Sequence, residues 1–486
     1  MPLLTRTQSS ARPIKVMQFG EGNFLRAFID WMLQRMDDTC SLDAQVQIIQ
    51  PRRPNGNAER INAQNGLYTL IQRGFSNGNL VESSSLIDVV EGCINPYSDW
   101  DKAVATACLP TLRFVFSNTT EAGIEYQQEN YTPGTSQESF PAKLASLLFE
   151  RFKTFNGAPD KGLLLFPCEL IDNNGTQLRE IILKYAADWK LPPEFAQWLN
   201  SSCAFFNTLV DRIVAGYPSD EAASYEQKFG YEDKLMVCCE PFHFLAIEGD
   251  AHLAAELPFE KAGLNVVVTD NLEPYRTRKV RFLNGVHTCT VPAAILAGHT
   301  LVDEMMTDDL LNGFIQQAVF QEVFPTVSLP DAEKRSYADS VLERFRNPYA
   351  KHRLLSIALN SISKWKVRVL PTLKDYRAMT GKLPRCLAFS LAVLLRFYMT
   401  ENGDGFASTV KYSLNDTPEV LKFFSTQTAQ FKQFCDLNCY IINALGNQAL
   451  WGEDLNAIPN LSAVIAQDLD DILQNGIRAA MQRLLS

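Results

Sequence analysis

The spacing of apolar residues divides the chain into two halves of different character. In the first half, short apolar runs typical of β-strands alternate with segments whose apolar residues recur every three or four positions, as on one face of a helix. The runs expected to form strands are residues 14–19, 46–50, 66–71, 80–82, 112–116, 161–167 and 264–268. Strands that alternate with helices are typical of a parallel sheet with helices on both faces.

The second half shows helical spacing almost throughout. The segments with this spacing are residues 291–296, 310–324, 332–345, 354–365, 386–398, 420–434, 438–445 and 461–485. Prolines are expected to separate several of them, at Pro292, Pro330, Pro348, Pro371 and Pro384. We therefore expect a mostly α-helical domain over residues 271–486.

The first expected strand runs directly into the glycine turn Gly20-Glu21-Gly22, which a helical pattern follows. A strand, a glycine turn and a helix in this order bring backbone N–H groups up to the pyrophosphate of a dinucleotide. The third glycine of the usual fingerprint is missing, because Leu25 or Arg26 stands at its place, so an ordinary tight turn is the alternative. The pattern predicts a Rossmann-type, doubly wound α/β domain over residues 1–270.

The second expected strand ends without the acidic residue that commonly holds the adenosine ribose of NAD. Gln50, Pro51, Arg52 and Arg53 stand there instead. Arginines at this place can bind the 2′-phosphate of NADP, or they can belong to a solvated turn. The choice between NAD and NADP is therefore open on these residues.

Polar and small residues follow two further expected strands, in the segments 117–123 and 168–175. The carboxyl ends of parallel strands meet at one edge of a sheet, where a cofactor or substrate binds. The alternative is ordinary turn chemistry.

A cluster of polar residues lies at the start of the helical half, where Lys279, Asn284 and His287 share a largely apolar segment. At about 100° per residue, His287 falls about 80° from Lys279 and Asn284 about 140°, with Arg281 and Gly285 behind this arc. A lysine in apolar surroundings loses hydration, so its pKa falls and it can act as a base. An amide beside it can donate to a developing oxyanion. The alternative is a lysine that reaches water and a histidine satisfied within the core.

Composition narrows the classes of partner. The chain has 486 residues and a formal net charge of −10, which argues against nucleic acid. No window approaches about 18 uninterrupted apolar residues, and the first residues are polar, so neither a membrane span nor an export signal is expected. The 11 cysteines are scattered and the five histidines lack metal-ligand spacing, so we expect reduced thiols in a cytoplasm and no metal site.

Taken in order, these motifs resemble the polyol-specific long-chain dehydrogenases, also called the mannitol dehydrogenase family. The resemblance covers nearly the whole chain from about residue 14. Its motifs are FGEGNFLRAF at 19–28, QNGLYTL at 64–70, TTEAG at 119–123, VDRI at 210–213, EPF at 240–242 and K-x4-N-x2-H at Lys279, Asn284 and His287. Each motif is weak alone, but their joint order is specific.

The resemblance implies hydride transfer with NAD(H) without a metal ion. Lys279 would be the general acid/base, Asn284 would stabilise the oxyanion, and His287 would orient the substrate. The residues that would hold the coenzyme are Phe19, Gly20, Glu21, Gly22, Asn23, Phe24, Arg26, Thr119 and Glu121.

One departure from the mannitol branch of the family concerns the second oxyanion donor. That branch reads Cys-Asp-Asn where this chain has Cys168-Glu169-Leu170, and a leucine cannot donate. The donor would then come from Asn173, Asn174 or Lys279.

A second departure is Arg276, which stands where the mannitol branch has an acidic residue. The same helical arithmetic puts Arg276 at about 60°, between Lys279 and His287. An arginine there can clamp a carboxylate with two hydrogen bonds, which indicates a sugar acid as substrate. Pairing of Arg276 with an acid such as Glu169 or Asp211 is the alternative.

The segment 167–175 is similar to a branch of the family that interconverts D-tagaturonate and D-altronate with NAD(H) in hexuronate breakdown. This resemblance implies a small sugar acid as partner and NAD as cofactor, with NADP not excluded. Nucleic acid and membrane are not expected, and the oligomeric state stays open. The candidate substrate-binding residues are Arg276, Glu169, Asn173, Asp211 and Lys364.

Other activities are alternatives at this point. Within the same class they are fructuronate reductase (D-mannonate oxidoreductase) and mannitol dehydrogenase. From other classes they are a hexuronate epimerase that retains its NAD, and a nucleotide sensor without chemistry.

Overall fold

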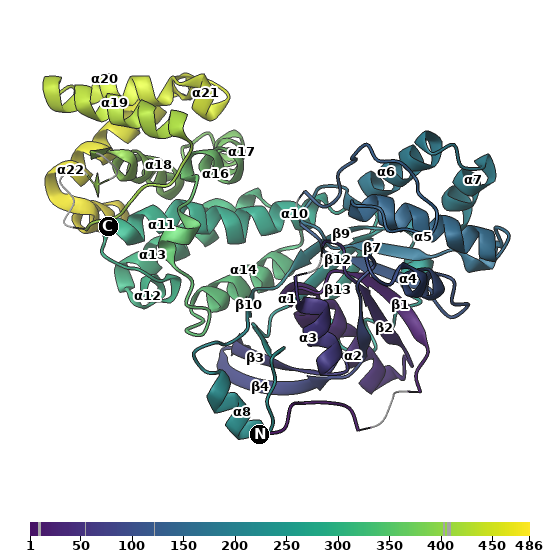
Figure 1. Cartoon of the computed structure of the whole chain (residues 1–486). Coiled ribbons are helices and arrows are strands. Elements are labelled where there is room, and N and C mark those ends of the chain that lie inside the picture. Colours follow the sequence, from purple (N-terminus) through teal and green to yellow (C-terminus); the bar gives the residue numbers. More distant parts are fainter. Residues whose placement is uncertain (8–10, 54, 121, 402–403, 406–409) are drawn as a thin grey trace. The chain divides into compact units, whose positions relative to one another are not determined.

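The computed structural model describes residues 1–7, 11–53, 55–120, 122–401, 404–405 and 410–486. The chain divides into two compact units, Met1–Leu272 and Glu273–Ser486, here called the N-terminal and the C-terminal unit (Figure 1). This division lies two residues beyond the boundary expected from the sequence.

The N-terminal unit is built on a six-stranded parallel sheet with the order β5-β2-β1-β6-β7-β8. Its strands are β1 (Ile14–Phe19), β2 (Gln45–Ile49), β5 (Val90–Ile94), β6 (Phe114–Ser117), β7 (Leu164–Pro167) and β8 (Ala204–Phe205). The register sets Phe19 beside Ile49 and Ser117, and Ser117 beside Pro167. Four carboxyl ends are therefore level at one edge, where sheets of this kind bind ligands.

Both faces of this sheet are apolar because successive residues of the central strands point to opposite sides. Val115 and Leu165 belong to one hydrophobic cluster, whereas Phe114 and Leu164 belong to the other. The helices that contribute to these clusters are α1 (Asn23–Ala27), α2 (Ile29–Cys40), α3 (Asn57–Ala63), α4 (Trp100–Ala107), α5 (Phe140–Thr154), α6 (Asn174–Asp188) and α7 (Pro193–Ser202). The expected Rossmann-type sheet is confirmed, although β5 and β8 were missed.

Two smaller sheets complete this unit, in the orders β10-β11-β3-β4 and β13-β12-β9. The expected hairpin is present and longer than expected, with β3 (Tyr68–Ser76) antiparallel to β4 (Asn79–Ile87). The remaining elements are β9 (Asn207–Asp211), β10 (Val214–Gly216), β11 (Val237–Cys239), β12 (Phe244–Glu248), β13 (Val266–Thr269), η1 (Pro159–Lys161), α8 (Ala222–Phe229) and α9 (Ala251–Ala254).

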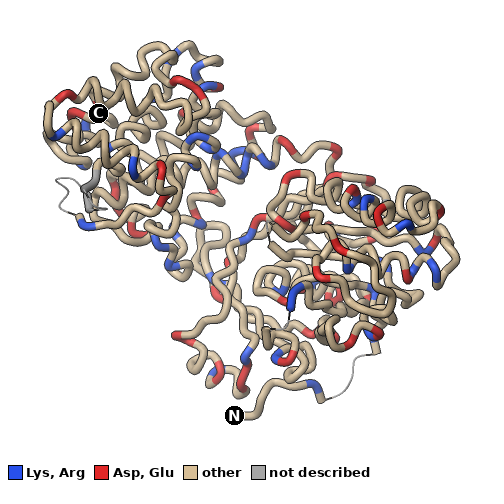
Figure 2. The backbone as a smooth tube through the Cα atoms, turned by 45° about the horizontal axis from the view of Figure 1, so that its top comes forward, with Lys and Arg blue, Asp and Glu red and all other residues tan. Residues whose placement is uncertain are grey.

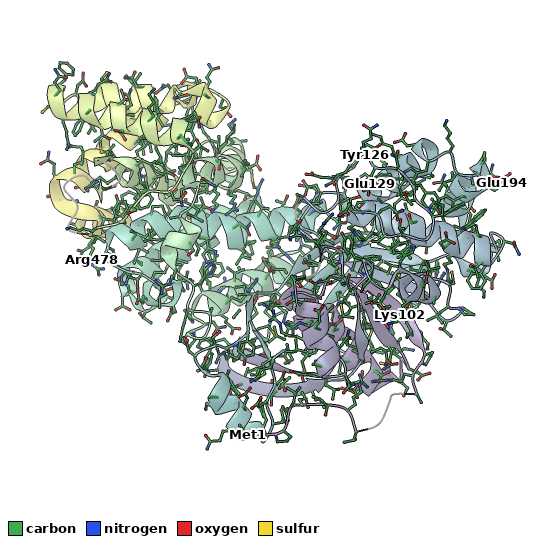
Figure 3. The ribbon with its side chains drawn as sticks, in the orientation of Figure 1. Met1, Lys102, Tyr126, Glu129, Glu194 and Arg478 are labelled. Carbon is green, nitrogen blue, oxygen red and sulfur yellow. The ribbon has the colours of Figure 1, made fainter. Side chains whose placement is uncertain are left out.

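The connection between β6 and α5 is fixed against α6. The Tyr126 hydroxyl donates to Asp188 at 2.6 Å. Glu129 accepts from the backbone N–H groups of Glu138 and Ser139, and Ser139 caps α5; Figure 3 labels Tyr126 and Glu129. The hydrogen bonds therefore hold the start of α5 in place.

The C-terminal unit is almost entirely helical, as expected. Its elements are α10 (Glu273–Arg278), η2 (Lys279–Gly285), α11 (Val286–Leu296), α12 (Val302–Thr307), α13 (Asp309–Gln317), η3 (Ala318–Val323), η4 (Phe324–Thr326), α14 (Asp331–Phe345), α15 (Leu354–Ile357), α16 (Ser361–Arg368), α17 (Leu370–Thr380), α18 (Arg385–Tyr398), β14 (Thr400–Glu401), β15 (Asp404–Gly405), α19 (Pro418–Phe434), α20 (Leu437–Leu445), α21 (Gln448–Trp451), η5 (Leu455–Ala457) and α22 (Leu461–Leu485).

The core of this unit is formed by α11 and α18, which pack against each other. Every residue of α11 is buried, and so is every residue of α18 after Arg385. A helix that is apolar all round must be covered on all sides. Pro292 lies inside α11, so the expectation that it separates two helices is wrong. In the part of the chain that the structure describes, each helix is too short or too polar to cross a bilayer.

Asn174, at the start of α6, ties the end of β7 to β9. Its side-chain amide donates to the carbonyls of Pro167 and Glu169 at 2.9 and 3.0 Å, and its Oδ1 accepts from the backbone N–H of Thr208 at 2.9 Å. One fully buried side chain therefore bonds backbone groups at the end of β7 and in β9.

We expect Asn174→Ala to lower the free energy of unfolding of the N-terminal unit by about 2 kcal/mol or more, because buried backbone groups lose their partners. Thr176→Ala, at an exposed neighbouring position, should change it by less than about 0.5 kcal/mol. Urea denaturation followed by fluorescence measures both. Equal effects of the two substitutions would contradict the role of the Asn174 side chain.

Candidate functional site

The glycine turn after β1 is shaped for a close approach of backbone groups. Gly20 has φ of 130°, and a Cβ there would lie 2.7 Å from the Asn118 carbonyl oxygen, so no larger residue fits. A Cβ at Gly22 would meet nothing within 4 Å. The turn thus presents open space beside the start of α1 at the ligand-binding edge of the sheet, and this geometry fits a dinucleotide.

The other expected coenzyme residues fall into two groups. Glu21, Gly22, Asn23 and Arg26 line a cavity of about 520 Å³. The rings of Phe19 and Phe24 pack within the fold instead, Phe19 against Phe140 and Phe24 against Phe28. Glu121 lies outside the described residues.

Arg26 is buried and has structural partners. Its guanidinium donates to the Leu235 carbonyl at 2.5 Å and to the Asn23 side chain at 2.7 Å. It also lies over the Tyr68 ring, 5.1 Å from the centroid. Desolvation lowers its pKa. Arg26 therefore joins α1 to the segment before β11, and its role toward a coenzyme stays a prediction.

Beside Arg26, Asp30 is a fully buried carboxyl group in the first turn of α2. It accepts from the Tyr68 hydroxyl at 3.1 Å. Desolvation raises its pKa to about 7. This role of Asp30 cannot be read along the chain, because the burial of a single carboxylate depends on the packing around it.

Glu169 and Thr119 bind each other at the ends of β7 and β6. The buried Glu169 carboxylate accepts from the Ser117 hydroxyl at 2.9 Å and from the Thr119 N–H and hydroxyl, both at 3.1 Å. Desolvation raises its pKa, and these bonds oppose the rise. The structure thus gives both residues a role in joining two strands, and contact with a ligand stays a prediction.

The remaining expected residues of this unit are dispersed. Asn173 is exposed and Asp211 is buried at the end of β9. Asn174 cannot be the second oxyanion donor, because its side-chain N–H groups and its Oδ1 are already hydrogen-bonded to protein groups. Leu170, which replaces that donor, is 59% exposed.

The segment that carries the expected catalytic residues has a helical geometry that the sequence did not reveal. Residues Lys279–Gly285 form a π-helix, η2, between α10 and α11. The α-helical angles expected for Lys279 and Asn284 are therefore wrong. A π-helix bonds each residue to the fifth one along, which is the spacing of this pair, so the two side chains lie on the same side. Turns of this kind are frequent at functional sites.

Two arginines, one beside the π-helix and one within it, anchor it to neighbouring segments. Arg278 is buried and pairs with Glu333 of α14 at 3.0 Å, with its guanidinium over the Tyr337 ring. Arg281 donates to the Thr326 carbonyl at 2.7 Å and also pairs with Asp375. These contacts fix η2 to α14, to the Thr326 backbone and to α17.

Asn284 of η2 and His287 of α11 each present a polar group for which the described residues provide no partner. Asn284 is half-buried, and among the described residues none bonds its side-chain amide. His287 is buried against Phe345, with ring centroids 4.0 Å apart, and within the same part of the chain its Nε2 is unpaired. Desolvation lowers the pKa of His287 well below its usual value, so its ring is neutral. Unpaired buried polar groups are costly, and a bound polar ligand would satisfy them.

The expected carboxylate clamp has a partner already. Arg276 forms an ion pair with Glu273 at 2.9 Å within α10, and pairing of Arg276 with Glu169 or Asp211 stays a prediction. Lys364 of α16 is half-buried and donates to the Ile357 carbonyl at 2.9 Å; desolvation lowers its pKa.

Arg368 is a candidate that sequence reasoning missed. It lies one turn after Lys364 on α16, and its guanidinium is 3.5 Å from the hydroxyl of Thr288, which in turn bonds the Asn284 carbonyl at 2.8 Å. Desolvation lowers its pKa, and no described carboxylate pairs with it. The packing of α16 against η2 and α11 brings Arg368 close to Thr288. In the sequence, the basic residues of α16 were the feature that could have indicated this role.

Lys and Arg are interspersed with Asp and Glu in both units (Figure 2). The described residues contain no group of three or more His, Cys, Asp or Glu side chains arranged to hold a metal ion.

Comparison with known proteins places this geometry in a family. The model of the mannitol dehydrogenase Rossmann domain matches residues 14–261, and that of the mannitol dehydrogenase C-terminal domain matches residues 271–473. The chain belongs to the mannitol dehydrogenase family.

Within this family the chain belongs to the altronate oxidoreductase branch, and it is an oxidoreductase acting on a CH–OH group. The altronate oxidoreductase of Enterobacter sp. (strain 638) is 44% identical over 97% of each chain. That of Escherichia coli O1:K1 / APEC is 42% identical over the same shares.

Solved structures share the fold. Pseudomonas fluorescens mannitol 2-dehydrogenase in a ternary complex with NAD and D-mannitol has a TM-score of 0.67 at 19% identity, covering 100% of this chain and 96% of that one. A D-sorbitol dehydrogenase in substrate-free form has a TM-score of 0.77 at 20% identity, covering 99% and 100%.

The raised pKa of Asp30 predicts a pH dependence of stability. Because the folded pKa of about 7 exceeds the usual aspartate value, folding favours the protonated form. Its contribution is therefore full below about pH 4 and is lost as the pH rises to about 7, by up to about 1.4 kcal/mol per pH unit. Asp30→Asn should be more stable than the wild type at pH 8, with the difference shrinking toward pH 5.

Urea denaturation at both pH values measures this difference. The exposed Asp220→Asn is the matched control and should follow the wild type at each pH. A constant offset between Asp30→Asn and the wild type would contradict the raised pKa.

Proposed function

We propose that this chain interconverts D-tagaturonate and D-altronate with NAD(H), without a metal ion. The observation that carries the proposal is that η2 and α11, which follow each other directly, carry Lys279, Asn284 and His287. Within the described part of the chain, no residue pairs with the Asn284 amide or the His287 Nε2. The identity of 44% to altronate oxidoreductases over nearly the whole chain supports the choice of substrate. The NAD complex of the fold relative, together with the glycine turn, supports the choice of coenzyme.

In this mechanism each polar group of the helix has one task. The coenzyme supplies the hydride when bound. Lys279 donates a proton to the new hydroxyl group in reduction and accepts it in oxidation. The Asn284 amide donates to the same oxygen as negative charge develops. His287, neutral because it is buried, orients a substrate hydroxyl with its unpaired nitrogen. The ammonium and the amide together polarise the carbonyl, which is the task a metal ion performs elsewhere.

For the substrate carboxylate, the structure supports Arg368 with Lys364 over Arg276. Glu273 already neutralises Arg276, whereas no described carboxylate pairs with Arg368. A half-buried guanidinium without an anion is complementary to a carboxylate, which it can bind through two parallel hydrogen bonds. We therefore propose Arg368 and Lys364 as the pair that recognises the acid group, with Arg276 as the alternative.

We expect Lys279→Ala to lower turnover of tagaturonate by about 10² or more, as loss of a general acid/base does, while NADH binding stays unchanged. Lys279→Arg should be equally impaired, because a guanidinium keeps its proton. The exposed Lys382→Ala is the matched control and should match the wild type. Steady-state NADH oxidation measures turnover, and turnover near wild type in Lys279→Ala would end the mechanism.

We expect Arg368→Gln to lower kcat/KM for tagaturonate by about 10²-fold, as removal of one partner from a buried charge pair does. The same substitution should change the rate with fructose, a neutral ketose, by less than about fivefold if only the carboxylate contact is lost. Arg276→Gln is the comparison variant. A larger loss of kcat/KM for tagaturonate in Arg276→Gln than in Arg368→Gln would indicate that Arg276 binds the carboxylate. Fructuronate in the same panel separates the two hexuronates.

A further inference from the structure

Glu21 lies between the two glycines of the turn, and its carboxylate is held by one of its two oxygens. Oε1 accepts from the side-chain amides of Gln50 at 3.4 Å, Asn55 at 3.2 Å and Asn57 at 3.5 Å. For Oε2, no donor lies within bonding distance among the residues described. The side chain is about nine-tenths buried, so its position is fixed and one acceptor stays open.

The position of the Glu21 carboxylate indicates which part of a dinucleotide it would contact. Gln50 directly follows β2, the strand whose end carries the acid that binds the adenosine ribose in many dinucleotide-binding sheets. This chain has no acid at that strand end. The contact with Gln50 shows that Glu21 brings a carboxylate to the same place from the neighbouring turn, and Glu21 also lines the 520 Å³ cavity beside Gly22.

Two of the basic residues near this place, Arg53 and Lys234, pair with other carboxylates. Arg53 pairs with Glu138 at 3.0 Å, and its side chain is 78% exposed. Lys234, which lines the cavity, pairs with Glu226 and Glu232, both at 3.3 Å. Arg60 also lines the cavity, with its Nε bonded to the Gly56 carbonyl at 3.3 Å. If Glu21 did not exclude a 2′-phosphate, Arg60 is the residue that would bind it.

We propose that Glu21 selects NAD over NADP by accepting hydrogen bonds from the adenosine ribose hydroxyls with its open oxygen. This inference rests on the proposed use of a nicotinamide coenzyme. A 2′-phosphate would replace one of the donors and bring up to two negative charges against a fixed, buried carboxylate. Gln50, Asn55 and Asn57 are positioning residues, because their amides orient the carboxylate and satisfy its other oxygen.

The test measures binding of NADH and NADPH separately, by fluorescence titration of the full-length chain without substrate. The wild type should bind NADH at least about 50-fold more tightly than NADPH, since a site built to accept from a hydroxyl strongly rejects its replacement. Glu21→Gln removes the charge at nearly constant shape, and the preference should fall to within about fivefold, with NADPH bound as tightly as before or more so.

Two further variants separate charge from position. Glu21→Asp keeps the charge but withdraws the carboxylate, so NADH should bind more weakly while NADPH is still rejected. Glu59→Gln makes the same change of charge at an exposed position of α3 and should leave the wild-type preference unchanged. Circular dichroism confirms that each variant is folded, and Glu21→Asp decides if Glu21→Gln does not fold.

The outcomes distinguish this inference from the proposed function. A wild type that binds neither nucleotide overturns the use of a nicotinamide coenzyme, and this inference with it. A wild type that prefers NADH, with the same preference in Glu21→Gln, overturns the role of Glu21 alone. Equal binding of NADH and NADPH by the wild type overturns it as well.

Discussion

The parallel register of β1 with β2 and β6 is the constraint on which the rest of the N-terminal unit depends. It sets the ends of these strands level, so that the glycine turn, Gln50 and Asn118 meet at one edge of the sheet. The close approach of Gly20 to the Asn118 carbonyl is possible only because both strands stop there. A shift of one residue would exchange the two apolar faces and separate these groups.

In the C-terminal unit, a change in helix geometry has a comparable effect. The π-helix η2 widens one turn, so Lys279 and Asn284 lie on the same side while Arg278 and Arg281 are anchored behind them. Among the described residues, none pairs with the Asn284 side-chain amide or with the His287 Nε2. Polar groups arranged in this way lower the stability of the free protein and are complementary to a ligand with several hydroxyl groups.

Two units with separate tasks fit the family to which the chain belongs. One presents a turn and a carboxylate suited to a dinucleotide, and the other presents a lysine, an amide and basic residues suited to a hydroxy acid.

The sequence by itself determined the order of the elements, the glycine turn, the helical second half and the set Lys279, Asn284 and His287. These features are local, since an apolar period of two or about four residues and a glycine between a strand and a helix can be read along the chain. The short strand β5 was missed because its few apolar residues give a weak period. Only the tertiary structure decided which polar groups are occupied: Glu169 by Thr119, Asn174 by the ends of β7 and β9, Arg276 by Glu273. It likewise decided the π-turn, the approach of Arg368 to Thr288 and the contact of Glu21 with Gln50, because each depends on the packing of segments far apart in the sequence.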